Sequence, residues 1–246
     1  MNQFKHFFIV GGQRCGTTFL YNAMETHSSI CMNKPVNPEP KYFIKNQKKL
    51  AYLYYVNKFF KHRKNEEILG EKSTSYLEFP SSGKFIFENF KDPKIIIALR
   101  NPVDRAISNY FFSKKNGLEN RSIEEVFLEN KPIPKIKIKT SVSPFIYIKR
   151  GEYIKYIKDY IRPFNKEQIG IFLYENFTTS KVEIQKIFSF LELNQSNEIQ
   201  LNKKINYTKK DSTIDESIIE KLHHHYRPFN KKLEDFLQID LSKWEN

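Results

Sequence analysis

The sequence predicts an α/β fold of three layers, in which helices cover both faces of a central parallel sheet. Short runs rich in Ile, Val, Leu and Phe recur along the chain, and such runs are typical of strands buried on both faces. Helical patterns lie between these runs, and a chain that alternates strand and helix forms a parallel sheet with right-handed crossovers. The chain has 246 residues, a length that one domain accommodates. We therefore predict a single α/β/α domain over residues 1–246.

The predicted elements alternate along the chain. Four strands share a short, apolar composition, and they are expected at residues 4–10, 67–73, 94–100 and 168–174. Six helices share apolar residues at helical spacing, and they are expected at residues 17–26, 46–64, 102–114, 151–162, 181–193 and 215–237. Proline-rich, basic or polar stretches are expected to form loops at residues 28–41, 131–144 and 194–212. Loops of this length inside a compact domain are usually functional or mobile.

The formal net charge of +13 favours an anionic partner, such as nucleic acid, anionic lipid, an acidic glycan or a phosphorylated cofactor. A solvated basic surface is the alternative explanation of the same charge. Only two cysteines, Cys15 and Cys31, are present, which is too few for a disulfide framework, so a reducing cytosol is the simplest location. The apolar run near the N-terminus is interpreted as a strand and not as a signal peptide, and no run approaches the ~20 apolar residues that span a bilayer. We therefore expect a cytoplasmic protein without a transmembrane segment.

Residues 11–18, with the sequence GGQRCGTT, resemble a phosphate-binding loop between a strand and a helix. The Walker A pattern G-x-x-x-x-G-K-[ST] is matched at both fixed glycines and at the last threonine, whereas Thr17 stands where the pattern has lysine. Backbone amides at a helix N-terminus bind an anion without that lysine, and Arg14 supplies a cation inside the loop. The predicted fold is thus P-loop-like, and a tight turn with an exposed arginine is the alternative. The missing lysine, and the arginine that ends the strand at 94–100, argue against a Mg²⁺-dependent NTPase.

A second motif, RNPVDRAISNY at residues 100–110, begins where another predicted strand ends. Pro102 is a favourable first residue for the helix that follows, and Arg105 lies one turn before Ser108 on the same helical face. An arginine fork beside a hydroxyl suits a phosphate group. Both motifs begin at the carboxyl end of a strand, where parallel sheets bind their ligands. The alternative is a capped helix with surface arginines.

Together the two motifs resemble those of the sulfotransferases that use 3′-phosphoadenosine 5′-phosphosulfate (PAPS). In that family the form G-x-x-[RK]-x-G-T-[TS]-x-L binds the 5′-phosphosulfate, and this chain has GGQRCGTTFL. The form R-x-P-x-x-R-x-x-S-x-Y binds the 3′-phosphate, and this chain has RNPVDRAISNY. Four further segments resemble the glycan-type members in the expected order: EPKYF (39–43), GEKSTSYL (70–77), residues 150–177, and YRPFNKKLEDFLQIDLSKW near the end. The resemblance therefore covers nearly the whole chain.

The resemblance implies in-line transfer of a sulfuryl group from PAPS to a hydroxyl or amine of an acceptor, with adenosine 3′,5′-bisphosphate (PAP) as product and no metal requirement. Glu39 would accept the proton of the acceptor, while Arg14 and Lys72 would stabilise the sulfuryl oxygens and the leaving phosphate. Arg100 and Ser108 would select the 3′-phosphate, and hence PAPS over ATP. The residues implied in binding PAPS come from both motifs and a late basic loop: Gly12, Arg14, Cys15, Gly16, Thr17, Thr18, Arg100, Ser108, Tyr207 and Lys209.

Several of these side chains have alternative interpretations that the sequence leaves open. Glu39, between two prolines, is also explained as a solvent-facing loop residue, and Lys72 as a surface lysine in a salt bridge. Glu71 competes with Glu39 as the carboxylate, but neighbours on a strand alternate, so it faces away from Lys72. The histidine triplet at 223–225 is interpreted as helix surface, because consecutive helical residues point about 100° apart and three do not easily share one ion. No metal site is predicted.

The acceptor is predicted only as a class. Basic segments at 45–64 and 131–139 suit a glycan or glycolipid that carries carboxylates or sulfates, although a solvated basic face explains them equally. Two other functions remain open: an ATP-dependent small-molecule kinase, suggested by the loop, and a nucleic-acid-binding module, suggested by charge alone. Thr17 in place of lysine, together with Arg100 and Ser108, favours the sulfotransferase. We therefore expect no nucleic-acid partner.

Overall fold

The computed structural model describes residues 4–45, 51–134, 142–195 and 214–245. The chain forms two compact units, each made of two segments of the sequence. Unit 1 comprises Met1–Arg100 and Lys158–Ile205, and unit 2 comprises Asn101–Ile157 and Asn206–Asn246. The single domain over 1–246 stays a prediction.

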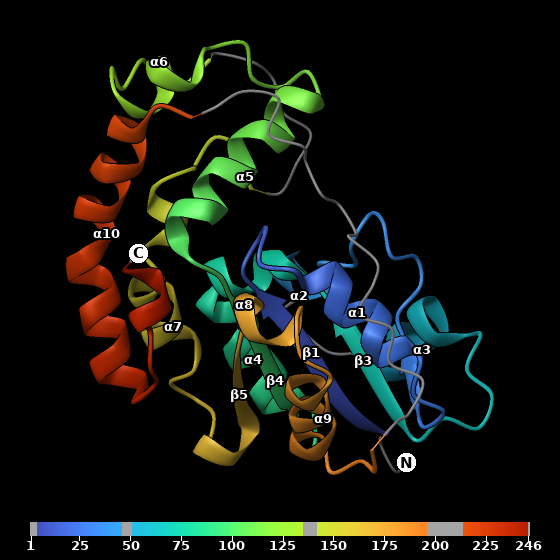
Figure 1. The fold of residues 1–246 in the computed structure, drawn as a ribbon. Coiled ribbons are helices and arrows are strands. Elements are labelled where there is room, and N and C mark those ends of the chain that lie inside the picture. The colour runs from blue at the N-terminus through green and yellow to red at the C-terminus, as the bar shows by residue number, and fades with distance from the viewer. Residues whose placement is uncertain (1–3, 46–50, 135–141, 196–213, 246) are drawn as a thin grey trace. The chain divides into compact units, whose positions relative to one another are not determined.

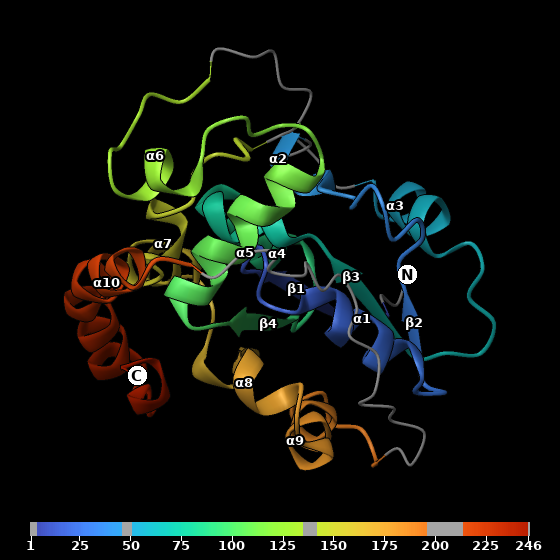
Figure 2. The same cartoon turned by 45° about the horizontal axis from the view of Figure 1, so that its top comes forward.

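Unit 1 is built on a five-stranded sheet in which all paired strands are parallel and the order is β2-β3-β1-β4-β5 (Figures 1 and 2). The strands are β1 (Lys5–Gly11), β2 (Ile30–Met32), β3 (Ile68–Lys72), β4 (Lys94–Leu99) and β5 (Ile169–Leu173). Four of them confirm the predicted strands. The stretch 28–41, however, was predicted as a loop and contains β2. Three residues are too few to show a strand pattern in the sequence, and it is the pairing with β3 that makes them a strand.

Helices cover both faces of this sheet, so the predicted three-layer arrangement is confirmed (Figures 1 and 2). They are α1 (Thr17–Glu25), α2 (Tyr42–Lys45), α3 (Tyr52–Phe60), α4 (Pro80–Asn89), α8 (Tyr174–Phe177) and α9 (Lys181–Phe190), with the 3-10 helices η1 (Thr74–Glu78) and η3 (Lys166–Gln168). The sequence prediction missed α4, although Pro80 in its first turn is a favourable start. The predicted helix at 46–64 corresponds to α3 in part, and residues 46–50 lie outside the described residues.

One face of the sheet is covered by aromatic side chains from α2, α3 and the end of α4. Alternate residues of a strand point to the same face, which places His6 and Phe8 of β1 together on this side. Both rings contact Phe90, with ring centroids 4.7 Å and 5.1 Å away, and Phe43 and Tyr55 pack beside them. These contacts bury β1 on this face and leave His6 only 2% exposed.

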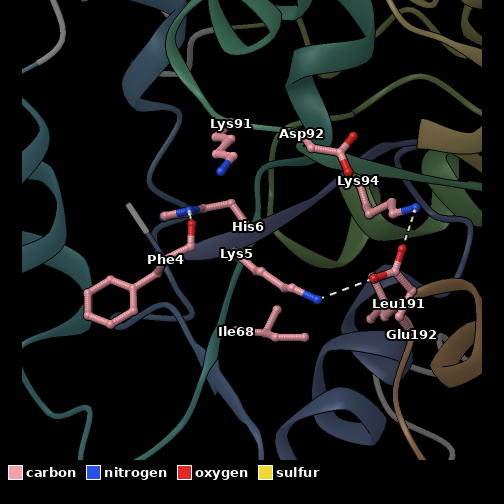
Figure 3. Close-up of a pocket in the computed structure, with 9 residues that line it drawn as sticks. All are labelled: Phe4, Lys5, His6, Ile68, Lys91, Asp92, Lys94, Leu191 and Glu192. Atoms are coloured by element: carbon pink, nitrogen blue, oxygen red, sulfur yellow. Dashed lines mark hydrogen bonds and ion pairs between the residues drawn. The ribbon is translucent and has the colours of Figure 1, made fainter. Parts of the chain in front are cut away.

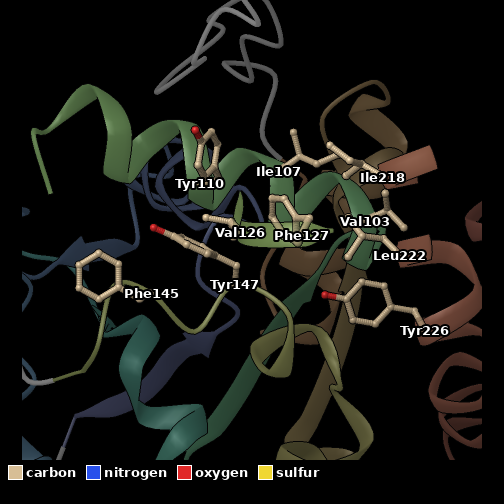
Figure 4. Close-up of a cluster of buried hydrophobic side chains, with 11 residues drawn as sticks. Val103, Ile107, Tyr110, Val126, Phe127, Phe145, Tyr147, Ile218, Leu222 and Tyr226 are labelled. Carbon is tan, nitrogen blue, oxygen red and sulfur yellow. The ribbon is translucent and has the colours of Figure 1, made fainter. Parts of the chain in front are cut away.

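Unit 2 is helical and contains α5 (Pro102–Lys115), α6 (Ile123–Phe127), the first part of α7 (Ile154–Tyr160), α10 (Glu216–Leu237), and the 3-10 helices η2 (Lys149–Gly151) and η4 (Ser242–Trp244). Figure 4 shows the buried cluster that joins α5, α6 and α10 to the segment before η2. Its members are Val103, Ala106, Ile107, Tyr110, Val126, Phe127, Phe145, Tyr147, Ile218, Leu222 and Tyr226. The last three recur every four residues on α10, as one face of an amphipathic helix requires. Within the described ranges, no helix combines the length and apolarity needed to cross a bilayer.

The buried His6 should make unit 1 sensitive to mild acid. Burial lowers the pKa of His6 from 6.5 to about 4, opposed by its hydrogen bond with the Phe4 carbonyl oxygen. The pKa of His6 is lower in the folded protein than in the unfolded chain. The stability that neutral His6 contributes is therefore present above pH 6.5 and is lost as the pH falls toward 4. Between pH 7 and pH 5 the wild-type protein should lose about 2 kcal/mol more free energy of unfolding than the His6→Phe variant, measured by urea denaturation. Equal losses in the two proteins would contradict this role of His6.

Candidate active site

The chain turns sharply between the end of β1 and the start of α1. Gly12 N donates to the Ala98 carbonyl oxygen of β4 at 2.6 Å, and Cys15 N donates to the Gly12 carbonyl oxygen at 3.2 Å. Arg14 and Gly16 have φ angles of 67° and 76°, in the left-handed region that is unfavourable for arginine. Gly16 precedes α1 without a capping side chain. The first turn of α1 is therefore the kind of helix N-terminus that binds anions.

All the predicted residues of the first motif lie in this turn or in the first turn of α1. They are Gly12, Arg14, Cys15, Gly16, Thr17 and Thr18. Cys15 is wholly buried and Thr17 is nearly so, which makes Cys15 a packing residue of the turn. Tyr207 and Lys209, the predicted residues of the late loop, lie outside the described residues.

Tyr174 connects the turn to the end of β4. A Cβ atom at position 16 would lie 2.6 Å from the Tyr174 ring. Only glycine, which has no Cβ, therefore fits beside this ring. The guanidinium carbon of Arg100 lies 4.5 Å from the centroid of the same ring, a cation–π contact. Arg100 and the turn therefore share one aromatic neighbour. The sequence reasoning assigned Tyr174 no role, and the available signal was a tyrosine placed directly at the end of a predicted strand.

Glu39 and Lys72 form a largely buried ion pair at the end of β3. Lys72 Nζ lies 3.0 Å from Glu39 Oε1, and the two side chains are 3% and 13% exposed. Thr74 donates to Glu39 Oε2 twice, from its backbone N at 3.0 Å and from its Oγ1 at 2.9 Å. The sequence left open that Glu39 faces solvent and that Lys72 lies at the surface. Neither alternative holds, because both side chains are largely buried. Thr74 was missed, although it lies two residues after Lys72 in the GEKSTSYL segment.

Lys72 also connects this ion pair to α1. Its Nζ lies 3.4 Å from Thr18 Oγ1, and its backbone N donates to Asn33 Oδ1 at 2.9 Å, which fixes the end of β3. A carboxylate, an ammonium, a hydroxyl and the first turn of α1 therefore meet at the carboxyl edge of the sheet. Such a set of groups can bind an anion and accept a proton from a neutral nucleophile.

Glu71 points to the other side of β3 from Lys72, as strand alternation predicts. Its carboxylate accepts hydrogen bonds from Tyr55 OH and Ser73 Oγ, both at 2.6 Å. Burial raises the pKa of Glu71, while hydrogen bonds from Ser73, Tyr55 and Tyr76 act in the opposite direction. Of the two competing carboxylates, Glu39 is therefore the one that lies beside Lys72 and α1.

The second motif falls on both sides of the boundary between the units. Arg100 is the last residue of the first segment of unit 1, and Ser108 lies half-buried in α5 of unit 2. Arg105, expected on the face of Ser108 as a phosphate ligand, is wholly buried. It donates to the Tyr147 carbonyl oxygen and, at 3.4 Å, to Asn109 Oδ1. That expectation is corrected: the long side chain turns inward and satisfies polar groups in the interior of unit 2.

The histidine triplet belongs to the surface of α10. His225 Nε2 lies 3.0 Å from Glu152 Oε1, and His224 is exposed. Across the described part of the chain, no three His, Cys, Asp or Glu side chains are placed to hold one metal ion.

Figure 3 shows a cavity of about 220 Å³. It lies at the amino ends of the strands, whereas the Glu39–Lys72 pair lies at a carboxyl end. It is lined by the first residues of three strands, Lys5, Ile68 and Lys94. Both lysines are paired with Glu192, whose carboxylate oxygens lie 3.2 Å from Lys5 Nζ and 3.3 Å from Lys94 Nζ. Because parallel sheets bind ligands at the carboxyl ends of their strands, the candidate active site is the edge with Glu39 and not this cavity.

Known proteins resemble the chain over most of its length. The family described as "Sulfotransferase domain" matches residues 4–236. Carbohydrate sulfotransferase 15 of Mus musculus is 24% identical over 307 aligned residues, which cover 98% of this chain and 54% of that protein. Heparan sulfate glucosamine 3-O-sulfotransferase 3B1 of Mus musculus is 25% identical over 247 residues, which cover 91% of this chain and 61% of that protein. The chain thus spans little more than half the length of these relatives.

A solved structure shares the fold. The crystal structure of a sulfotransferase from Alicyclobacillus acidocaldarius matches with a TM-score of 0.78 and 23% identity, and the match covers 100% of both chains. The predicted α/β/α architecture is therefore also that of a known structure.

The turn at Gly16 should tolerate no side chain. Gly16→Ala adds left-handed strain of about 1–2 kcal/mol and overpacking against Tyr174 of about 1–3 kcal/mol. Gly117→Ala is the matched control, because its φ is +67° and nothing lies within 4 Å of its added Cβ. Urea denaturation should show the larger loss for Gly16→Ala, and equal losses would contradict the contact with Tyr174.

Proposed function

Because the chain belongs to the sulfotransferase domain family, we propose that it transfers a sulfuryl group from PAPS to a hydroxyl or amine of an acceptor and releases PAP. The observation that carries this proposal is the junction of Glu39, Lys72 and Thr18 at the start of α1. A base, a cation and an anion-binding helix start are the groups that such a transfer uses. PAPS would supply the activated sulfuryl group.

We assign the donor to the carboxyl edge of the sheet. The amides of the first turn of α1, with Arg14 and the hydroxyls of Thr17 and Thr18, suit the 5′-phosphosulfate. Arg100, held against the Tyr174 ring, is proposed to recognise the 3′-phosphate. Ser108 is proposed to contribute to the same recognition through its place in the second motif, and Tyr207 and Lys209 through theirs in the late basic loop.

Glu39 is proposed as the general base. Its carboxylate takes the proton of the acceptor while the acceptor atom forms a bond to sulfur. The bond between sulfur and the bridging 5′-phosphate oxygen breaks, and PAP leaves with those electrons. Lys72 and Arg14 offset negative charge on the sulfuryl oxygens and the leaving phosphate. The two hydrogen bonds from Thr74 orient the Glu39 carboxylate for this step.

A glycan is proposed as the acceptor. Two supports exist: the relatives named as carbohydrate and heparan sulfate sulfotransferases, and the net charge of +13, which attracts an anionic chain. A small-molecule kinase is not favoured, because Thr17 replaces the Walker lysine, and a nucleic-acid-binding module rests on charge alone. A cytoplasmic location is proposed from the two cysteines, Cys15 and Cys31, which are buried and form no disulfide.

A thermal-shift screen separates the three candidate functions. PAP at about a hundred times its dissociation constant should raise the melting temperature by about 5–10 °C, well beyond ATP or duplex DNA at the same concentration. The Arg100→Ala variant should lose the preference for PAP over adenosine 5′-phosphate. Stabilisation by ATP or DNA that equals that by PAP would contradict the proposed donor.

The Glu39→Gln variant should bind PAP as the wild-type protein does but lose transfer. Loss of a general base should lower kcat by roughly 10²–10⁴-fold, measured as PAP formed from PAPS with a panel of glycans that includes heparan sulfate. Glu192→Gln is the control, because it removes another ion-paired carboxylate at the opposite edge of the sheet. Turnover retained in Glu39→Gln would exclude Glu39 as the base.

A further inference from the structure

We propose that Glu71 is a positioning residue, which holds the segment after Glu39 in place through two hydroxyl groups, those of Ser73 and Tyr76. The inference rests on the proposed function, in which Glu39 is the base. Glu71 does not reach the site itself, since it lies on the face of β3 opposite Lys72 and is 1% exposed. Of the hydroxyls around Glu71, those of Ser73 and Tyr76 also contact the backbone that follows Glu39.

The first connection runs through Ser73. Ser73 Oγ donates to Glu71 Oε1 at 2.6 Å and accepts from Lys41 N at 2.8 Å. A hydroxyl has one proton, and Ser73 donates it to Glu71. The lone pairs of the Ser73 oxygen can then accept the hydrogen bond from the Lys41 N–H. Lys41 has a φ angle of 47°, a conformation unfavourable for lysine. The hydrogen bond to Ser73 helps to hold this conformation.

The second connection runs through Tyr76. Its hydroxyl accepts from Phe43 N at 3.1 Å, and burial, followed by the charge of Glu71, raises the pKa of that hydroxyl. Tyr76 is wholly buried, so its hydroxyl has little access to water. Lys41 and Phe43 follow Glu39 by two and four residues, so both hydroxyls act on the same short segment.

Glu39 is consequently held from two directions. Thr74 and Lys72 bind its carboxylate, while Ser73 and Tyr76 bind the main chain that leaves it. Pro40, directly between Glu39 and the held segment, has a fixed φ and transmits the position of that segment. A general base acts at a heavy-atom distance of about 3 Å, and a misplacement of about 1 Å can lower the rate roughly 10²-fold. The orientation of two buried hydroxyls therefore bears on the position of the proposed base.

Tyr55 provides a matched control. Tyr55 OH donates to Glu71 Oε2 at 2.6 Å, and Tyr55 is wholly buried, as Tyr76 is. The variants Tyr55→Phe and Tyr76→Phe each remove one buried phenolic hydroxyl that affects the pKa of Glu71. Of the two, Tyr76→Phe is the one that also removes an acceptor from the main chain after Glu39.

The first measurement is amide hydrogen exchange, which needs no substrate. The Phe43 N–H should exchange about five- to tenfold faster in Tyr76→Phe, and the Lys41 N–H should do so in Ser73→Ala, because each loses a neutral hydrogen bond. Tyr55→Phe should leave both amides within about twofold of the wild-type rate. Equal acceleration in Tyr55→Phe, or none in Tyr76→Phe, would overturn the inference.

The second measurement is turnover with PAPS and the same glycan panel. Tyr76→Phe and Ser73→Ala should lower kcat by roughly 10- to 100-fold while the affinity for PAP stays unchanged, and Tyr55→Phe should retain kcat. A wild-type kcat in Tyr76→Phe despite faster exchange would refute a positioning role. If the wild-type protein turns over no acceptor, the proposed function fails, and the amide exchange rates still decide whether Glu71 and its hydroxyl partners hold the segment.

Discussion

The alternation of side chains along β3 is the constraint on which the candidate active site depends. Consecutive residues of a strand face opposite sides, so Lys72 meets Glu39 while Glu71 meets Ser73. If the pairing of β3 with β1 shifted by one residue, the side chains of β3 would exchange faces. The Lys72 ammonium would then lie among buried hydroxyls. The observed register, which pairs Ile9 with Lys72, therefore decides which charged side chain lies in the site.

The position of β1 at the centre of the sheet explains how the turn at 11–18 acquires its cations. β1 lies between β3 and β4, so the strand on one side ends in Lys72 and the strand on the other is followed by Arg100. The carboxyl ends of parallel strands lie at the same edge, where open α/β sheets bind ligands. Because backbone hydrogen bonds of the sheet fix these strand ends, the two cations are placed more rigidly than residues of a long loop would be.

The sequence predicted those parts of the fold and site that have a local pattern. The apolar runs of β1, β3, β4 and β5 and the glycines of the turn are local signals, and the expectation that Glu39 and Lys72 belong to one site followed from the resemblance to sulfotransferase motifs. β2 and α4 were missed because one is too short for a pattern and the other begins among polar residues. The burial of Arg105 and the contact between Tyr174 and Gly16 depend on tertiary packing, which the spacing of residues in a sequence does not encode.

The hydroxyl partners of Glu71 also show why a buried carboxylate has a use that an apolar side chain would not have. Burial raises the pKa of Glu71, which means that its hydrogen bonds offset the loss of hydration only in part. An apolar residue would avoid that loss of hydration and would often be neutral or favourable for stability. It would also leave the hydroxyl proton of Ser73 without its acceptor. The Ser73 oxygen would then no longer be held with its lone pairs toward the main chain at Lys41. The carboxylate therefore serves the orientation of its neighbours more than the stability of the core.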